Sequence, residues 1–124
     1  FDHVSLKSTR LADMQRFYET VLAPLGIEKK FFIDRPEGGV AGFGRERVEL
    51  FIMGASGPEP TPLHLAFRAR NREELAVFHA GAVSAGGADN GAPGIRPNYH
   101  DAYYAAFVID PDGNNVEAVF QGRE

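Results

Sequence analysis

His3-Val4-Ser5-Leu6 near the start of the chain and His64-Leu65-Ala66-Phe67 near its middle have the same form, a histidine followed by alternating residues. Alternation of apolar and smaller or polar residues over a short run predicts a β-strand with one buried face. The two histidines are 61 positions apart in a chain of 124 residues, which is about half its length. This spacing indicates an internal duplication.

An amphipathic helix is expected after each of these strands. The first covers about residues 9–25, where Pro24 should end the regular helix early and Gly26 provides the stop. The second opens at Asn71, which can cap it, with Glu74 placed to reach back to Asn71. The apolar residues of the two helices recur at helical spacing: Leu11, Met14, Phe17, Tyr18, Val21, Leu22 and Leu25, then Leu75, Phe78, Ala82 and Ala85.

Three further strands are expected in each half. They are predicted at about 29–34, 40–45 and 47–53 in the first half, and at 93–97, 103–109 and 115–120 in the second, with a long loop over 86–101. The predicted fold is α+β: two tandem βαβββ modules forming one curled eight-stranded mixed sheet with helices on its outer face. Module 1 covers about 1–54, a Pro-rich linker 55–62 and module 2 about 63–124, in a single domain.

The turn Asp110-Pro111-Asp112-Gly113-Asn114 sets the register of the last two strands. If all five residues form the loop, Ile109 pairs with Asn115, and Phe107 then lies across from Glu117 with Tyr103 on the same face. A two-residue loop would give that position to Tyr104. We favour the five-residue loop.

Composition excludes several classes of function. The net charge is −4 and the basic residues are scattered, which argues against nucleic acid as a partner. No apolar run is long enough to span a bilayer, so a cytoplasmic protein is expected. Cysteine is absent, which leaves histidine and carboxylates as candidate metal ligands.

Strand parity brings four such ligands to one side. Val4, Leu50, Leu65 and Val116 belong to the helix-covered face, so their neighbours His3, Glu49, His64 and Glu117 face the other way. A curled sheet would aim all four into one pocket. Two imidazoles and two carboxylates suit one divalent ion such as Zn, Ni, Co, Mn or Fe(II).

In these features the chain resembles the vicinal oxygen chelate superfamily, which includes glyoxalase I, extradiol dioxygenases and bleomycin-binding proteins. The residues that carry the resemblance include both histidine strands, Val48-Glu49-Leu50, and Phe107 through Val119 with its Asp110–Asn114 turn. The full His, Glu, His, Glu set resembles that of glyoxalase I and implies a metal-dependent lyase or isomerase acting on vicinal oxygens, with Glu117 or Glu49 as the base. The resemblance also implies a homodimer, and it leaves open whether the ligands come from one chain or two.

Two alternatives remain within that family: a non-catalytic small-molecule or antibiotic binding and resistance protein, and an Fe(II)-dependent extradiol-type dioxygenase. In either case the partner is a small molecule. The residues expected to form the wall of its pocket are Phe51, Arg96, Tyr99, His100, Tyr103, Tyr104 and Phe107.

Overall fold

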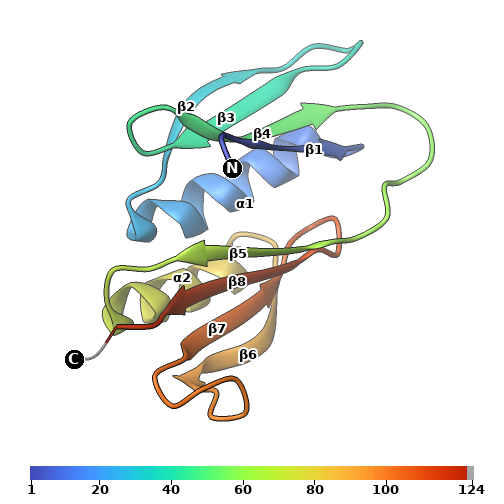
Figure 1. Ribbon diagram of the computed structural model, residues 1–124. Coiled ribbons are helices and arrows are strands. Elements are labelled where there is room, and N and C mark those ends of the chain that lie inside the picture. The colour runs from blue at the N-terminus through green and yellow to red at the C-terminus, as the bar shows by residue number, and fades with distance from the viewer. Residues whose placement is uncertain (123–124) are drawn as a thin grey trace.

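Each half of the chain folds into a four-stranded sheet with one long helix against it (Figure 1), as seen in the computed structural model, which describes residues 1–122. Module 1 contains β1 (Val4–Ser8), α1 (Leu11–Leu22), the short 3-10 helix η1 (Ala23–Leu25), β2 (Glu28–Ile33), β3 (Val40–Gly44) and β4 (Val48–Gly54). Module 2 contains β5 (His64–Arg68), α2 (Arg72–Ser84), β6 (Ala88–Ile95), β7 (Tyr104–Ile109) and β8 (Asn115–Phe120). The α+β class and the duplicated βαβββ module are therefore confirmed.

The two sheets have the same topology. Their strand orders are β1-β4-β3-β2 and β5-β8-β7-β6, with the first strand of each module parallel to the last and the other pairs antiparallel. Leu6 and Ser8 of β1 are buried while Ser5 and Lys7 are exposed, which matches the predicted alternation of faces.

Most local predictions agree with the structure. The first helix is regular to Leu22, and Pro24 lies in the 3-10 turn that ends at Gly26, whose φ is 79°. Asn71 caps α2 by accepting a hydrogen bond from the Glu74 backbone N–H at 3.0 Å. The Glu74 carboxylate, however, binds the backbone N–H and guanidinium of Arg70 instead of reaching back to Asn71.

One strand was misplaced by the sequence reasoning. β6 spans Ala88–Ile95, inside the stretch expected to be a loop, and its register with β7 shifts between Asp89 and Gly91 and again between Gly91 and Gly94. These irregularities accommodate glycine and proline in the strand. Because β6 is at the edge of its sheet, a residue without a backbone N–H can face away from the neighbouring strand and leave no carbonyl there without a hydrogen bond.

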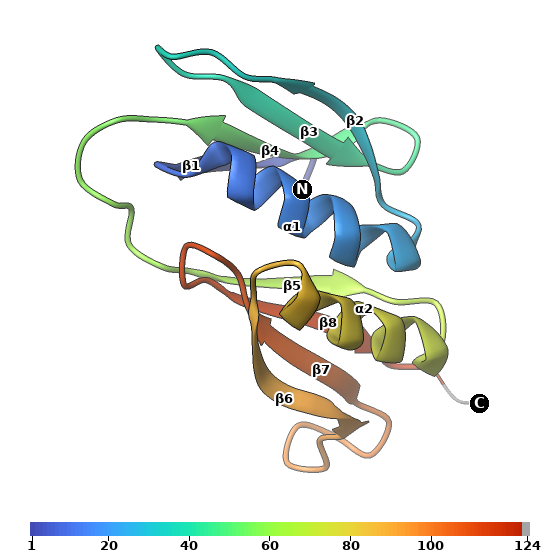
Figure 2. The ribbon, with the colours of Figure 1, turned by 180° about the vertical axis from the view of Figure 1, so that it is seen from behind.

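The predicted eight-stranded sheet is not present within one chain. In the described residues the strands form two separate four-stranded sheets, and α1 and α2 contact each other where the modules meet (Figure 2). α1 lies between the two sheets, whereas α2 covers one face of the second sheet and keeps a solvent-exposed side, with Val77 56% and Val83 59% exposed. The other face of each sheet carries no helix.

A buried hydrogen bond joins the modules. The Tyr18 hydroxyl on α1 donates to Asp110 Oδ2, in the β7–β8 turn, at 2.6 Å. Burial, together with the charge of Asp110, raises the pKa of Tyr18 well above its ordinary value, so the hydroxyl stays protonated as a donor. Close packing accompanies the bond, because a Cβ on Gly87 would lie 2.4 Å from the Phe17 ring.

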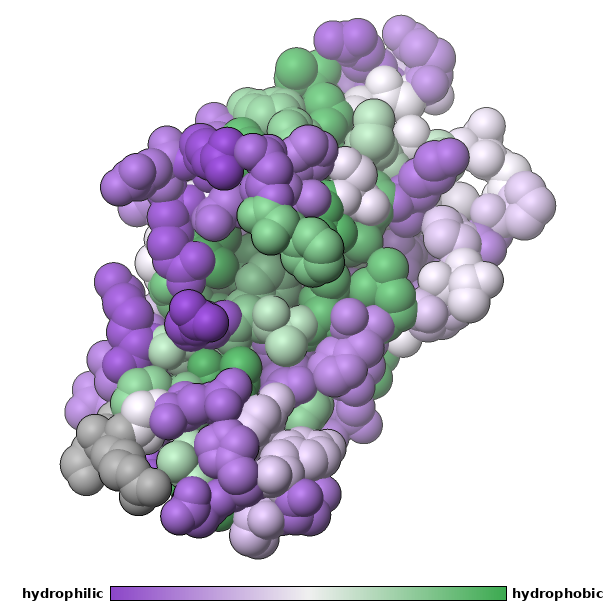
Figure 3. Space-filling view, viewed as in Figure 1, coloured by the Kyte–Doolittle hydropathy of each residue, from purple (hydrophilic) through white to green (hydrophobic). Residues whose placement is uncertain are grey.

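None of the described helices is both long enough and apolar enough to cross a membrane. Apolar side chains do gather across the middle of one face, at the level where the two modules approach each other (Figure 3).

Replacing Tyr18 by Phe should lower the free energy of unfolding by about 1.5–3 kcal/mol, because the buried Asp110 carboxylate loses a donor while the ring still packs. Urea denaturation followed by circular dichroism measures the change. Tyr99→Phe is the control, since Tyr99 is 57% exposed, and it should leave stability within about 0.5 kcal/mol. An unchanged Tyr18→Phe variant would contradict this role for the bond.

Candidate functional site

Glu117 is the centre of the polar cluster on the helix-free face of module 2. Its side chain lies in β8 and is almost completely buried, with a relative exposure of 2%. His64 Nε2, on β5, lies 2.9 Å from Oε1, and the Tyr103 hydroxyl donates to Oε2 at 2.5 Å. A buried carboxylate needs such partners, because an unpaired charge away from water is strongly unfavourable.

An aromatic side chain, Phe107, lies beside this carboxylate. Phe107 is directly across from Glu117 in the β7–β8 pair, and Ile109 pairs with Asn115, so the predicted five-residue turn and register are confirmed. The Phe107 ring centroid is 6.3 Å from that of His64.

The same register separates the two neighbouring tyrosines. Tyr103 contacts Glu117, whereas Tyr104 packs on the helix side of the sheet, where its ring lies 4.4 Å from the guanidinium carbon of Arg72. The prediction that Tyr104 lines the pocket is therefore wrong, because a strand sends successive side chains to opposite faces.

The loop between β6 and β7 forms a wall next to Glu117. It is closed by the Arg96 backbone N–H donating to the Tyr103 carbonyl at 2.7 Å. The rings of Tyr99 and His100 meet Tyr103 edge to face, with centroid distances of 4.9 and 5.4 Å. His100 Nε2 lies 2.7 Å from Gln121 Oε1, so His100 supports the wall and does not reach Glu117.

Tyr103 is held in its protonated form. Its pKa is raised to about 12, first by burial and then by its hydrogen bond to Glu117 and the charge of that carboxylate. The phenol therefore remains a donor through neutral and mildly alkaline pH.

Module 1 presents the other two predicted ligands, His3 and Glu49, which in this structure have other partners. His3 Nδ1 lies 2.7 Å from Asp2 Oδ1, and its ring packs against Phe51 with centroids 5.4 Å apart. Glu49 is exposed and accepts a hydrogen bond from the Arg45 backbone N–H at 3.2 Å, with the Arg45 guanidinium 3.9 Å away. Arg45 was missed by the sequence reasoning, although its position four residues before Glu49 in the β3–β4 hairpin is a usable signal.

The modules also differ in register. Val4 pairs with Leu50 in module 1, whereas Leu65 pairs with Val116 in module 2. Taking Glu49 and Glu117 as equivalent, the pairing of first and last strands is shifted by two residues between the modules. Because the shift is even, both glutamates keep the parity predicted for them.

The four predicted ligands do not form one cluster within a chain. In the described part of the chain, no group of three or more His, Cys, Asp or Glu side chains is arranged to hold a metal ion. His64 and Glu117 form one half of the donor set in module 2, and His3 and Glu49 belong to the other half in module 1. Imidazole and carboxylate are suitable donors for Zn, Ni, Co, Mn or Fe(II), so the chemistry of these four residues fits a metal, although within one chain they lie in two separate modules.

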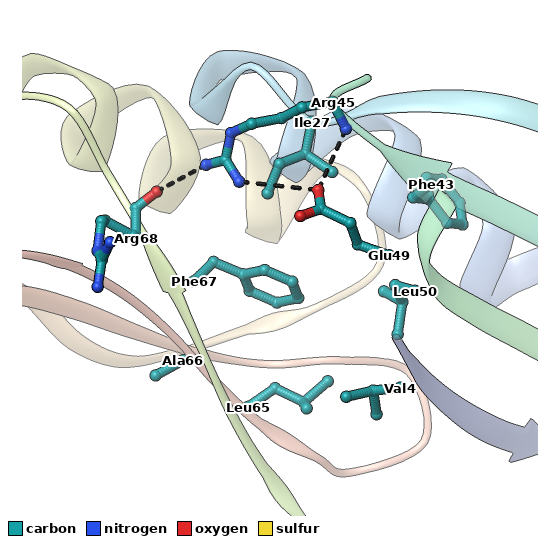
Figure 4. Close-up of a pocket in the computed structure, with 10 residues that line it drawn as sticks. All are labelled: Val4, Ile27, Phe43, Arg45, Glu49, Leu50, Leu65, Ala66, Phe67 and Arg68. Atoms are coloured by element: carbon teal, nitrogen blue, oxygen red, sulfur yellow. Dashed lines mark hydrogen bonds and ion pairs between the residues drawn. The ribbon is translucent and has the colours of Figure 1, made fainter. Parts of the chain in front are cut away.

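A separate cavity of about 210 Å³ lies between the modules (Figure 4). Its lining is mostly apolar, with Arg45 and Glu49 at its polar side: Val4, Ile27, Phe43, Arg45, Glu49, Leu50, Leu65, Ala66, Phe67 and Arg68. His3, His64 and Glu117 are not part of it, so this cavity is distinct from the cluster around Glu117.

Comparison with known proteins identifies one family model that matches residues 1–118, described as the Glyoxalase/Bleomycin resistance protein/Dioxygenase superfamily. No curated protein matches the chain. Among solved structures, a glyoxalase/bleomycin resistance protein from Albidiferax ferrireducens T118 is 25% identical with a TM-score of 0.72, and the match covers 98% of each chain.

Two further structures share the fold at lower identity. A glyoxylase/bleomycin resistance protein/dioxygenase domain from Frankia sp. EAN1pec is 19% identical, with a TM-score of 0.73 and coverage of 98% of this chain and 97% of the other. The V278E mutant of glyoxalase I from Zea mays is 22% identical with a TM-score of 0.72, and the match covers 96% of this chain but only 45% of the maize chain.

The raised pKa of Tyr103 predicts a specific titration. The difference in tyrosinate absorbance between wild type and Tyr103→Phe should stay near zero up to about pH 11, because the phenol titrates near 12. Glu117→Gln should move this transition to lower pH, since it removes the nearby negative charge. Glu46→Gln removes an exposed carboxylate elsewhere and should not move it. A Tyr103 transition near pH 10 in the wild type would contradict the assigned hydrogen bond.

Proposed function

Because the chain belongs to the glyoxalase/bleomycin resistance protein/dioxygenase superfamily, we propose that it is a metal-dependent, glyoxalase-like lyase or isomerase acting on a small molecule with vicinal oxygens. The observation that carries the proposal is the buried Glu117 carboxylate, held by His64 and Tyr103 on the helix-free face of its sheet. A desolvated carboxylate beside an aromatic wall is suited to proton transfer on a bound organic molecule.

We further propose that the complete site is built across a homodimer. Among residues 1–122, β1 pairs with β4 alone and β5 with β8 alone, so each of these first strands has one edge without a strand partner there. Pairing β1 of one copy with β5 of a second would join their sheets into an eight-stranded sheet. It would bring His3 and Glu49 of one copy opposite His64 and Glu117 of the other, and the two-fold symmetry would generate two such sites.

In this arrangement the four side chains would hold one divalent ion. When bound, the ion supplies a Lewis acid that stabilises negative charge on two adjacent substrate oxygens. Glu117 takes the proton from the substrate carbon and returns it to the neighbouring carbon. We assign this step to Glu117 rather than Glu49 because Glu117 is shielded from water, whereas Glu49 is exposed and paired with Arg45.

The remaining site residues position the substrate and exclude water. Tyr103 orients the Glu117 carboxylate through its hydroxyl, and Phe107 provides an apolar surface beside it. Phe51, packed against His3, supplies the corresponding surface from module 1.

A second candidate is a small-molecule binding protein without turnover. It is favoured by one observation: His64 and Glu117 already satisfy each other at 2.9 Å, so the pair is stable with no metal between them. The amount of metal bound by the purified protein distinguishes the metal-dependent enzyme from the binding protein.

Protein purified without chelator should retain about one ion per chain, or take it up from Zn, Ni, Co, Mn or Fe(II). His64→Ala and Glu49→Gln should each reduce retention at least about tenfold, since each removes one ligand. Glu46→Gln, three residues before Glu49 in the same hairpin, is the matched control and should retain metal. Elemental analysis gives the stoichiometry. A wild type that neither retains nor takes up metal would reject the enzyme proposal and favour the binding protein.

The shared site can be tested by mixing two defective chains. One carries His3→Ala and Glu49→Gln, the other His64→Ala and Glu117→Gln, and each alone should bind almost no metal. Their heterodimer should regain about one ion per two chains, because one of its two sites has all four native ligands. Differently tagged chains, co-expressed and purified through both tags, allow the measurement. A purified heterodimer that stays metal-free would place the ligands within one chain, and failure to form any dimer would reject the shared site.

A further inference from the structure

The Arg96 side chain is held in place by neighbouring groups on the helix-free face of module 2. Its guanidinium donates from Nη1 to the Gly94 carbonyl at 2.9 Å and from Nη2 to the Ala92 carbonyl at 2.8 Å. It also lies over the Phe107 ring, with its central carbon 5.3 Å from the ring centroid. These contacts hold a long, otherwise flexible side chain in one place.

Glycine makes room for this arrangement. Gly91 has a φ of +151°, and a Cβ there would lie 3.1 Å from both Arg96 Nη2 and the Phe107 ring. A Cβ on Gly94 would lie 3.3 Å from Arg96 Nη1. A side chain at either position would therefore crowd the Arg96 guanidinium.

The charge of Arg96 is not balanced by a carboxylate. The ion pairs of the described residues include none to Arg96, whose two observed partners are neutral carbonyls. A guanidinium has five N–H donors and remains protonated at any physiological pH. Arg96 therefore keeps both positive charge and donor groups for a ligand.

Phe107 lies between this cation and the proposed metal half-site. The ring is 5.3 Å from the Arg96 guanidinium carbon and 6.3 Å from the His64 ring, and Glu117 is its cross-strand partner. A molecule little longer than the phenyl ring can thus contact Arg96 at one end and the His64 and Glu117 side at the other.

From this geometry we infer that the ligand of the site carries an anionic group, a carboxylate or a phosphate, that binds Arg96 while its vicinal oxygens face His64 and Glu117. The inference rests on the proposed function and names its substrate class: short, chelating molecules with a separate anionic end. A planar guanidinium pairs with a carboxylate through two parallel hydrogen bonds, which adds geometric selectivity to charge attraction.

The test compares two probes that differ only at the distal end. 2-Oxoglutarate has a 2-oxo acid group with vicinal oxygens and a distal carboxylate, and its 5-methyl ester replaces that carboxylate by a neutral group. Calorimetry should show wild type, incubated with Zn²⁺, binding the dicarboxylate at least about tenfold more tightly than the ester. Arg96→Gln should bring this ratio to about one with little change in affinity for the ester, and Arg96→Lys should restore part of it.

Arg68→Gln is the matched control, because Arg68 lies on β5 with the same strand parity as His64 and its loss changes the net charge equally. Its ratio should equal that of the wild type. A wild-type ratio near one, an unchanged ratio in Arg96→Gln, or an equal loss in Arg68→Gln would overturn the inference.

Zinc content, measured on the same samples, keeps this result separate from the proposed function. Arg96→Gln should retain as much zinc as the wild type. If no sample retains zinc, the proposed function fails, and the probe ratio in metal-free protein still decides whether Arg96 selects an anionic ligand.

Discussion

The hydrogen bond between Tyr18 and Asp110 governs how the two modules are arranged. It joins residues 92 positions apart in a fully buried setting. Asp110 also accepts hydrogen bonds from the backbone of Asp112 and Asn114 and from the Asn114 side chain, so the same carboxylate shapes the β7–β8 turn. The same carboxylate therefore takes part both in the turn and in the contact between α1 of module 1 and the β7–β8 turn of module 2.

This docking explains why the two halves of the donor set are separate. α1 lies between the two sheets and contacts α2, and in the described residues the first strands belong to two separate four-stranded sheets. In the proposed dimer a second copy would supply the missing sheet edge. The duplication would then have a functional consequence, since each module would contribute one imidazole and one carboxylate to each site.

The helix-free face of module 2 places a buried anion and a cation within a small area. Glu117 is a buried anion that is satisfied by His64 and Tyr103, whereas Arg96 is a cation satisfied only by neutral carbonyls. Phe107 contacts the Arg96 guanidinium and is the cross-strand partner of Glu117. The acidic net charge of the whole chain gives no indication of this local pattern, since a site is determined by which few charges a sheet brings together.

Features that depend on short-range rules can be predicted from the amino-acid sequence. Strand parity placed Val4 and Leu65 on the helix side, helical spacing and Pro24 defined the first helix, and the five-residue turn aligned Phe107 with Glu117. These follow from backbone geometry over a few residues, which is the same wherever the segment lies.

How the segments meet depends on long-range packing, which is visible only in the folded chain. The pairing of His64 with Glu117, the Arg45 contact to Glu49 and the helix-to-helix docking all join residues whose separation is set by packing rather than by periodicity. β6 lies earlier in the chain than predicted for the same reason, because its glycines and Pro93 are poor strand formers and the strand is held by its pairing with β7. Local pattern specifies which way a side chain points, while its partner depends on long-range contacts that the pattern does not contain.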